Sequence, residues 1–422
     1  SIDATAAAAA VAVVGSGGGD SLGFAGGGVV ALNELRGSAQ AYILNADITD
    51  GASGNIAGAI TIKTTDLSQV EAKTVAAAVS VALSGGGKGT GVALGFTLAY
   101  NVIGWGMDPS DPGDLDPTTA YLKNATALAD GALTILATLV DGSVYRQIDA
   151  IVVTVAAAVA GSGGGDATSV GLGAAIALNR IGGDVSAFAE SIGVLTASAV
   201  TIQAIDRTRI KADTASASVT AALSGGGGGT AASISLSYAE NLIENNVDAY
   251  IKNVTSTSNI TGNVTVEALQ QSSIKAFGLA ASIGIAASGG GNAIGISGGG
   301  ILVRNVITSN TRAYIDNADL NVTGTLTVNS LNTSTIRATV LAVSGSVALT
   351  GGGTGVAVAI GVGVALNYVG SDQLGRGQSE VHAYIRNSDI TASGALAVKA
   401  RSTMDIDAIT VAASVAASVS GS

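Results

Sequence analysis

The sequence predicts an all-β protein, a β-solenoid of the parallel β-helix kind whose repeating unit is about 62 residues long. Three features recur at fixed intervals and support this prediction. An aliphatic-x-Ala step is followed after 15 residues by three consecutive glycines, and an asparagine follows the first glycine after 16 residues. The steps start at Ile2, Val70, Ile148, Ile210, Ile274, Ile336 and Ile406, the glycines start at Gly17, Gly85, Gly163, Gly225, Gly289 and Gly351, and the asparagines are Asn33, Asn101, Asn179, Asn241, Asn305 and Asn367.

This spacing divides the chain into six units and the start of a seventh. The units are residues 1–69, 70–147, 148–209, 210–273, 274–335 and 336–405, and residues 406–422 begin the next. We expect the extra length of the second and sixth units to form loop insertions at 104–119 and 370–379, outside the stack. We also expect the chain to be a segment of a longer array. Two to three rungs per unit, at ~4.8 Å each, predict a rod of roughly 60–90 Å.

Two strands of period two flank each glycine turn. In the second unit the larger side chains alternate with small ones on both strands. We expect the large residues to lie inside, and a one-residue phase slip after Ala72 to mark a bend or bulge. The large set includes Val79, Val81, Leu83, Leu94 and Leu98, and the small set includes Ala78, Ser80, Ala82, Ala93 and Gly95.

The second half of each unit predicts short strands of two to five residues between Asn, Ser-Gly or Asp corners. An aromatic residue recurs there, and we expect these rings to align along the stack. A residue that tolerates a left-handed turn closes each aromatic strand, and stacked asparagines would form an amide ladder. The aromatics are Tyr42, Tyr121, Phe188, Tyr250, Tyr314 and Tyr384, and the closing residues are Asn45, Asn124, Ser191, Asn253, Asn317 and Asn387.

Charge is almost absent from the glycine-turn half of the units. From the fifth residue after each step to the asparagine, the six units contain only Asp20, Lys88, Asp166, Glu240 and Arg304. We infer that the small-residue face is buried under another layer, either of this chain or of a neighbouring molecule, because flat Ala, Ser and Gly faces allow close sheet approach. We therefore predict lateral self-association through Ala78, Ser80, Ala82, Ala93 and Gly95. An exposed flat face is the alternative.

The composition limits the chemistry that the chain can perform. There is no cysteine, which excludes disulfides and thiolate metal sites, and the net charge of −11 argues against nucleic acid as a partner. The only histidine, His382, is expected on the outward side of a strand, and no catalytic cluster accompanies it. We therefore expect no enzyme activity, no small-molecule substrate and no cofactor. The one metal candidate is a weak Ca²⁺ site in the acidic insertion, formed by Asp108, Asp111, Asp114 and Asp116.

Two membrane interpretations are open, because mean hydropathy is +0.50. Residues 279–303 carry no charge over 25 positions, long enough for a membrane-spanning helix, but the glycine clusters and the alternation favour strands. A transmembrane β-barrel would also alternate, yet aromatic residues are only 3% of the chain, too few for the girdles of such barrels. A barrel of this kind, or a β-helix enzyme acting on polysaccharides, is the alternative function.

The amino-acid sequence of the repeats resembles that of a known kind of protein. Units of the form AAAVSVALSGGG, GVALGFTLAYNVI and ITASGALAVKA are similar to the repeats of very large bacterial filamentous adhesins, which include haemagglutinin-like and leukotoxin-like chains. The resemblance covers essentially the whole sequence and rests on texture and period. It implies a secreted, right-handed β-solenoid at the bacterial cell surface. It also implies that the partners are copies of the same chain, lateral or end-to-end, and a host or neighbouring cell surface.

Overall fold

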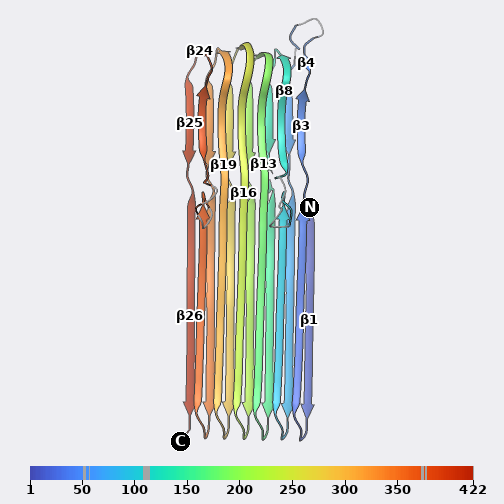
Figure 1. Ribbon diagram of the computed structural model, residues 1–422, viewed down its shortest axis with the longest axis vertical. Helices are drawn as coiled ribbons and strands as arrows, with labels where there is room; N and C mark the ends of the chain where they lie inside the picture. Colours follow the sequence, from blue (N-terminus) through green and yellow to red (C-terminus); the bar gives the residue numbers. More distant parts are fainter. Residues whose placement is uncertain (51–53, 57, 108–114, 372–374, 376–377, 422) are drawn as a thin grey trace.

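The computed structural model describes residues 1–50, 54–56, 58–107, 115–371, 375 and 378–421. Within these residues the chain is all-β, without a helix, and its three large sheets are parallel and stacked in chain order (Figure 1). This arrangement is compatible with the β-solenoid that the sequence predicts.

The first sheet has seven strands. In spatial order they are β1 (Ile2–Ser16), β6 (Gln69–Ser84), β12 (Gln147–Ser162), β15 (Arg209–Ser224), β18 (Ser273–Ser288), β21 (Thr335–Thr350) and β26 (Asp405–Ser420). The third sheet, of six strands, contains β5 (Ile60–Thr65), β9 (Leu133–Thr138), β14 (Val200–Asp206), β17 (Val264–Gln270), β20 (Leu326–Asn332) and β25 (Leu396–Ser402).

The second sheet has eleven strands and faces both of the others. Its main strands are β2 (Ser21–Leu35), β7 (Gly89–Ile103), β13 (Ala167–Ala197), β16 (Gly229–Ile260), β19 (Ala293–Val322) and β22 (Gly355–Val369). Shorter strands pair with the far ends of β13 and β19 or with each other: β3 (Ala39–Leu44), β4 (Asp47–Ile48), β8 (Pro117–Leu128), β23 (Val381–Arg386) and β24 (Ile390–Ala392). A small hairpin, β10 (Val140–Asp141) and β11 (Val144–Tyr145), lies outside these sheets.

Equivalent residues of successive units pair directly. In the first sheet Ile2 pairs with Val70 and Ile148 with Ile210, and the same register continues to Ile406. Each unit therefore advances the stack by one strand in each sheet, and the expectation of two to three rungs per unit is wrong. The rise is six strand spacings of ~4.8 Å, or about 29 Å, so the molecule is tall along its strands and short along the stack.

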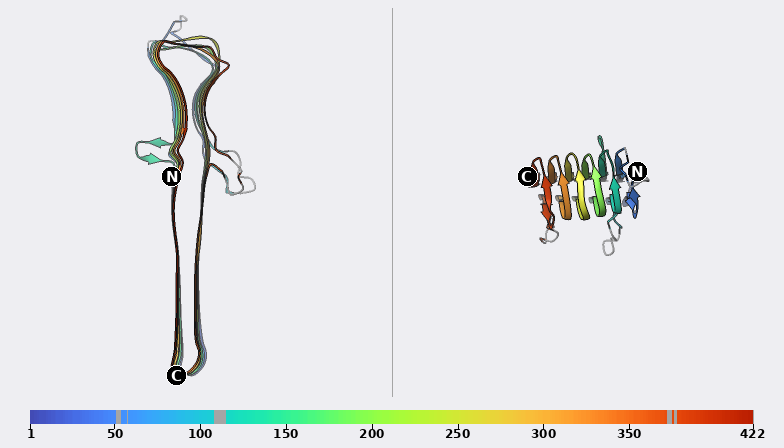
Figure 2. Two further views of the ribbon diagram at one scale, coloured as in Figure 1. Left: turned by 90° about the vertical axis from the view of Figure 1, so that its left-hand side faces the viewer. Right: turned by 90° about the horizontal axis from the view of Figure 1, so that it is seen from above.

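The long first and second sheets face each other (Figure 2). Their small residues point inward. On β6, Ala76, Ala78 and Ala82 are fully buried, whereas Val79 and Val81 point outward and are only partly covered. The expectation that the large residues lie inside is wrong for this half. The predicted phase slip after Ala72 is also wrong, because burial alternates without a break from Val70 to Ser84. The inward positions change from large to small along one straight strand.

Glycines on the second sheet show how closely the two layers approach. A Cβ at Gly91 would lie 2.7 Å from the Val159 carbonyl oxygen of the facing β12. Side-chain hydroxyls also form hydrogen bonds between the two sheets: Thr154 Oγ1 donates to the Ala174 carbonyl at 2.8 Å, and Ser233 Oγ donates to the Ser218 carbonyl at 2.7 Å. Only small side chains fit such a gap, so the Ala, Ser and Gly pattern follows from the packing of sheet on sheet.

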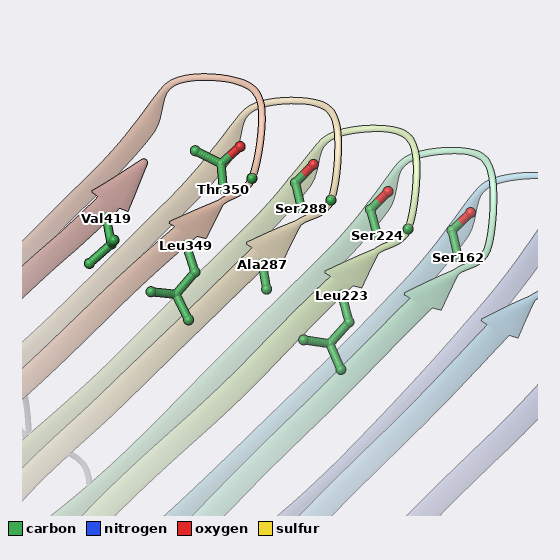
Figure 3. Close-up of a pocket in the computed structure, with 11 residues that line it drawn as sticks. Ser162, Leu223, Ser224, Ala287, Ser288, Leu349, Thr350 and Val419 are labelled. Atoms are coloured by element: carbon green, nitrogen blue, oxygen red, sulfur yellow. The ribbon is translucent and has the colours of Figure 1, made fainter. Parts of the chain in front are cut away.

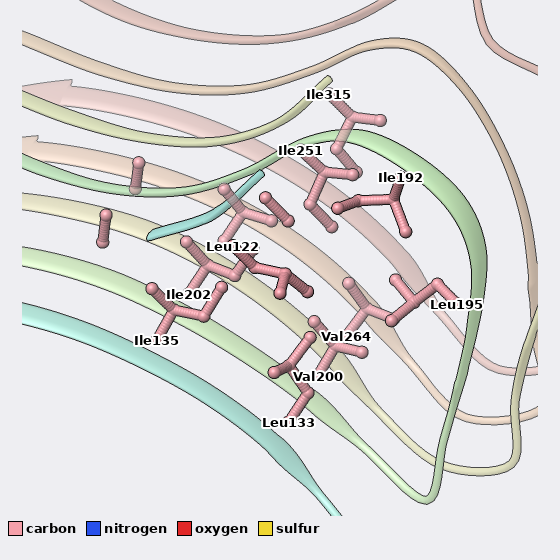
Figure 4. Packing of buried hydrophobic residues seen from close by; sticks show 14 of the residues in the cluster. Leu122, Leu133, Ile135, Ile192, Leu195, Val200, Ile202, Ile251, Val264 and Ile315 are labelled. Atoms are coloured by element: carbon pink, nitrogen blue, oxygen red, sulfur yellow. The ribbon is translucent and has the colours of Figure 1, made fainter. Parts of the chain in front are cut away.

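Past the stacked asparagines of the repeat, the packing is reversed, with large side chains inside and polar ones outside. Here the second and third sheets enclose large aliphatic side chains, and Leu122, Ile135, Ile192 and Ile202 are fully buried (Figure 4). Polar residues occupy the outside, where Arg312 forms two hydrogen bonds to Asp248, at 2.7 and 2.8 Å. We call this part the head and the small-cored part the slab. The neck between them is a belt of inward aliphatics that includes Val70, Ile103, Ile148, Ile181, Ile210, Ile243, Ile274, Ile307 and Ile336.

The strands of the head are longer than the sequence suggests. We expected strands of two to five residues after the asparagine. Instead, β13, β16 and β19 run through the asparagine without a break, and their full lengths are 31, 32 and 30 residues. The aromatic ladder is confirmed: successive rings stack with centroids 4.7–4.9 Å apart. The left-handed closing residues are also confirmed, with φ between 51° and 57° at all six positions.

The insertions are partly where we expected them. Pro117–Thr119 pair with Asp184–Ser186 within the sheet, so the insertion after the second asparagine ends before residue 117. The rest of that unit's extra length forms the β10–β11 hairpin, which the sequence analysis missed. Each insertion is closed at its base by a hydrogen bond to a left-handed glycine, Asp116 N to Gly104 O and Ser379 N to Gly370 O.

Candidate functional surface

The outer faces of the slab carry large apolar side chains. Because the small residues face inward, the alternating Val, Leu, Ile and Phe residues face outward on both long sheets. In the middle of the stack, Leu223 is 49% exposed and Leu236 is 50% exposed. We call these two outward faces the apolar band. In the second unit the band comprises Val75, Ala77, Val79, Val81, Leu83, Val92, Leu94, Phe96 and Leu98, and the other units contribute the equivalent positions.

Polar groups bound the apolar band at both ends. At the neck, the first sheet carries outward charges such as Lys73, Lys211 and Lys275, and the second carries Arg180, Glu240 and Arg304. At the other end are the glycine turns, whose charged residues are Asp20, Lys88 and Asp166. No charged residue lies between these limits in the units of the slab.

The band is large for an exposed surface. On the first sheet, eight residue steps at ~3.3 Å and six strand spacings of ~4.8 Å give an area of about 750 Å². On the second sheet, six residue steps and five strand spacings give about 500 Å². Soluble monomers rarely expose contiguous apolar patches beyond a few hundred Å², and larger ones mark interaction sites. The band is therefore the strongest candidate for a functional surface on the described residues.

The band is uneven. On the first sheet, near the glycine turns, Ala287 stands between Leu223 and Leu349, and the missing bulk leaves a hollow of about 500 Å³ (Figure 3). The serine and threonine residues that end the strands β12, β15, β18 and β21 line one side of it. On the second sheet, Gly300 stands between Leu236 and Val362 and leaves an apolar hollow of about 390 Å³.

The neck carries an ordered column of charges on the second sheet. Glu240 pairs with Arg180 at 3.2 Å and with Arg304 at 3.4 Å, and the Tyr238 hydroxyl donates to it at 2.7 Å. Burial opposes ionisation of Glu240, but the Tyr238 hydrogen bond and the two arginines outweigh burial and lower its pKa below the ordinary value. Burial, together with Glu240, raises the pKa of Tyr238 to about 12. Glu240 is therefore ionised at neutral pH.

The residues that we predicted as a self-association face lie elsewhere. Ala78, Ser80, Ala82 and Ala93 are fully buried between β6 and β7 of the same chain, and the Cβ that Gly95 lacks would meet Val155 and Thr154 of β12. The small face is therefore covered by the chain's own second layer. In the folded chain it is not available to a neighbouring molecule, and any lateral association has to use other residues.

The calcium candidate receives no support from the part of the chain that is described. Asp108, Asp111 and Asp114 lie outside the described residues, and Asp116 accepts hydrogen bonds from the Gly37 amide at 2.7 Å and from Arg36 at 3.2 Å. Elsewhere in the described chain no three His, Asp or Glu side chains gather as a metal site. His382 is exposed on β23, as expected.

A buried polar corner, which was not predicted from the sequence, lies where the third sheet returns to the first. Asp206 is fully buried and accepts hydrogen bonds from Asn245 at 2.7 Å, from Ser272 at 3.0 Å and from the Thr208 amide at 2.7 Å. Arg146, also buried, lies nearby, and burial lowers its pKa despite the neighbouring carboxylates Asp66, Asp206 and Asp116. The signal was visible as a recurring Asp, Gln or Asn two residues before Thr or Ser. The corner is closed to solvent, so its role is to shape the turn.

The described chain contains no helix with the length and apolar character needed to cross a bilayer, and residues 279–303 form the end of β18, a glycine turn and the start of β19. No protein-family model, curated protein or solved structure matches this chain.

Proposed function

We propose that this chain is a non-catalytic structural segment of a secreted bacterial adhesin or extracellular filament at the cell surface. In this proposal each unit of about 62 residues is one closed coil of a β-solenoid, and the whole array is a continuous stack. The domain divisions, the extracellular location and the absence of a substrate or cofactor belong to this proposal.

One observation supports this proposal more than any other: each type of stacked residue recurs at the same position in successive strands. The asparagines of the neck form a buried amide ladder, in which each Nδ2 donates to the Oδ1 of the next asparagine at 2.7–2.8 Å. The aromatic rings and the glycine turns stack in the same way. Identical ladders favour a scaffold that can be extended by adding units, whereas a catalytic site needs residues that occur once.

The constant register of the repeat suggests how copies associate. β1 and β26 form the two edges of the first sheet, and Ile2 and Ile406 occupy the same position in the repeat. A second copy that adds its β26 to β1 continues the ladder in register. We propose that this end-to-end pairing joins copies of the chain.

Deletion of one repeat tests the proposal. Removal of residues 274–335 joins repeat 4 to repeat 6, and we expect a folded protein with the same circular dichroism per residue, because β15 and β16 then pair with β21 and β22. Removal of residues 274–304, half a repeat, is the control and should abolish folding. If both deletions unfold the chain, the repeat is not an independent structural unit and the proposal fails.

A further inference from the structure

We propose that the apolar band spans a lipid bilayer: the slab inserts into lipid as a two-layered β structure, and the head stays in water. The partner is hydrocarbon, and the inference goes beyond the filament function proposed above. It rests on the position of the band, on its limits and on the way in which the slab satisfies its backbone.

The height of the band is close to, and slightly less than, the thickness of the hydrocarbon core of a bilayer. From Val75 to Leu83 on β6, eight residue steps give about 26 Å, and from Val170 to Ile176 on β13, six residue steps give about 20 Å. The hydrocarbon core of a bilayer is about 30 Å thick. Both faces of the slab thus carry an apolar strip that fits within the thickness of the hydrocarbon core.

Polarity along the slab follows that of a bilayer. The neck, with Lys73, Lys211 and the column around Glu240, would lie at one headgroup layer. The glycine turns would lie at the other. These turns are short and rich in Gly and Ser, and three of the six carry a charged residue after the glycines. They are therefore polar enough to lie among headgroups and small enough to pass through the bilayer during insertion.

The slab satisfies its backbone internally, as hydrocarbon requires. Each inner strand of the two long sheets pairs with a neighbour on either side in unbroken register along the slab. The turns also pair from unit to unit, as where Gly163 N donates to Ser84 O at 2.9 Å. β1 and β26 are the outermost strands of this stretch, and in lipid each needs a further strand beside it, from the same array or from another copy. In this respect alone the inference rests on the proposed function.

Two features favour lipid over a second copy as the occupant of the band. The hollows at Ala287 and Gly300 break the surface, and a fluid hydrocarbon fills them whereas a rigid sheet face leaves voids. The band also lacks the charges that fix register between two protein surfaces.

Flotation with phosphatidylcholine vesicles tests the proposal. The full 422-residue chain should float with the vesicles and stay bound through high salt and an alkaline carbonate wash. The double variant Leu172→Glu, Leu236→Glu places two carboxylates in the band, and we expect vesicle partitioning to fall by at least about a hundredfold. The matched control is Thr201→Glu, Thr265→Glu on the outer face of the head, which should float like the wild type. Circular dichroism of each variant checks that it folds.

The direction of insertion can be read with a single thiol, because the chain has no cysteine. Gly86→Cys lies at a turn where a Cβ has ordinary contacts, the nearest at 3.6 Å. In a spanning slab this thiol reaches the vesicle interior and resists an impermeant maleimide until detergent is added. Gln203→Cys, on the outside of the head, should react at once. Reaction of both thiols from outside would overturn the spanning arrangement.

Wild-type protein that does not float would overturn the proposal. If the unbound protein forms large assemblies that the Leu172→Glu, Leu236→Glu variant converts to single chains, the band binds second copies instead. Neither result affects the filament proposal, which the repeat deletion tests in the absence of lipid.

Discussion

Single residues in this protein are constrained by the rung above and the rung below as well as by their own strand. The triple glycine illustrates this at its first and third positions. A Cβ at Gly85 would lie 2.3 Å from the Gly17 carbonyl oxygen, and a Cβ at Gly87 would lie 2.5 Å from the Gly19 carbonyl carbon, whereas the middle glycine has ordinary room. The recurrence of three glycines thus reflects two sites of close approach and one site of tolerance.

Substitution within one turn separates these cases. Gly85→Ala should lower the free energy of unfolding by about 1–3 kcal/mol, because the backbone of two stacked turns must move apart. Gly86→Ala should change it by less than about 0.5 kcal/mol. Denaturant unfolding of the two variants measures the difference. Equal effects would show that the turns do not stack as described.

The charge column at the neck predicts a pH dependence. The pKa of Glu240 is lowered in the folded chain, so its contribution is present above the ordinary glutamate pKa of about 4.3 and is lost as pH falls through the folded value. Glu240→Gln should cost about 1 kcal/mol at neutral pH. It should also lose less stability than the wild type on acidification below pH of about 4. Identical acid profiles in urea unfolding would contradict this role.

At the scale of the strand, the alternation and the burial of the small face were predicted correctly, but the large residues of the slab were wrongly expected inside. Period two in β6 and β7 identified the two faces, but residue size did not identify the buried one. Large aliphatics ordinarily mark the interior, as they do in the head around Ile135 and Ile202. In the slab the interior is set by the separation of two flat layers, and a single strand carries no information on that separation. The near absence of charge was the better signal, because it marked both faces as protected from water.

Replacement of the small face tests this assignment. A chain in which Ala78, Ser80, Ala82, Ala93 and Gly95 are all glutamate should fail to fold, because five carboxylates would enter a closed interlayer. Glutamate at the outward Val79, Val81 and Leu94 should leave β structure intact. Circular dichroism distinguishes them, and a folded five-fold variant would refute the buried position of this face.

At the scale of the molecule, the chain joins two halves with opposite patterns on one continuous stack. The head has large residues inside and ion pairs outside, and the slab has small residues inside and the apolar band outside. The order of units and the aligned aromatics could be predicted from the spacing alone. The single rung per unit could not, because residue spacing counts the length of a coil without showing how wide the coil is. The apolar band could be recognised only from the structure, which places the large residues of the slab on the outside.

Cysteine accessibility along β13 and β14 tests this inversion most directly, and the chain is free of native cysteine. In the lipid-free protein, a small neutral thiol reagent should modify cysteine at the outward Val170, Leu172 and Ile176. It should spare cysteine at the inward Ser169, Ala175 and Ala177. On β14 the protected positions should instead be the large Val200 and Ile202, with Thr201 and Gln203 reactive. Protection of the large positions on β13 and reaction of the small ones would contradict the account.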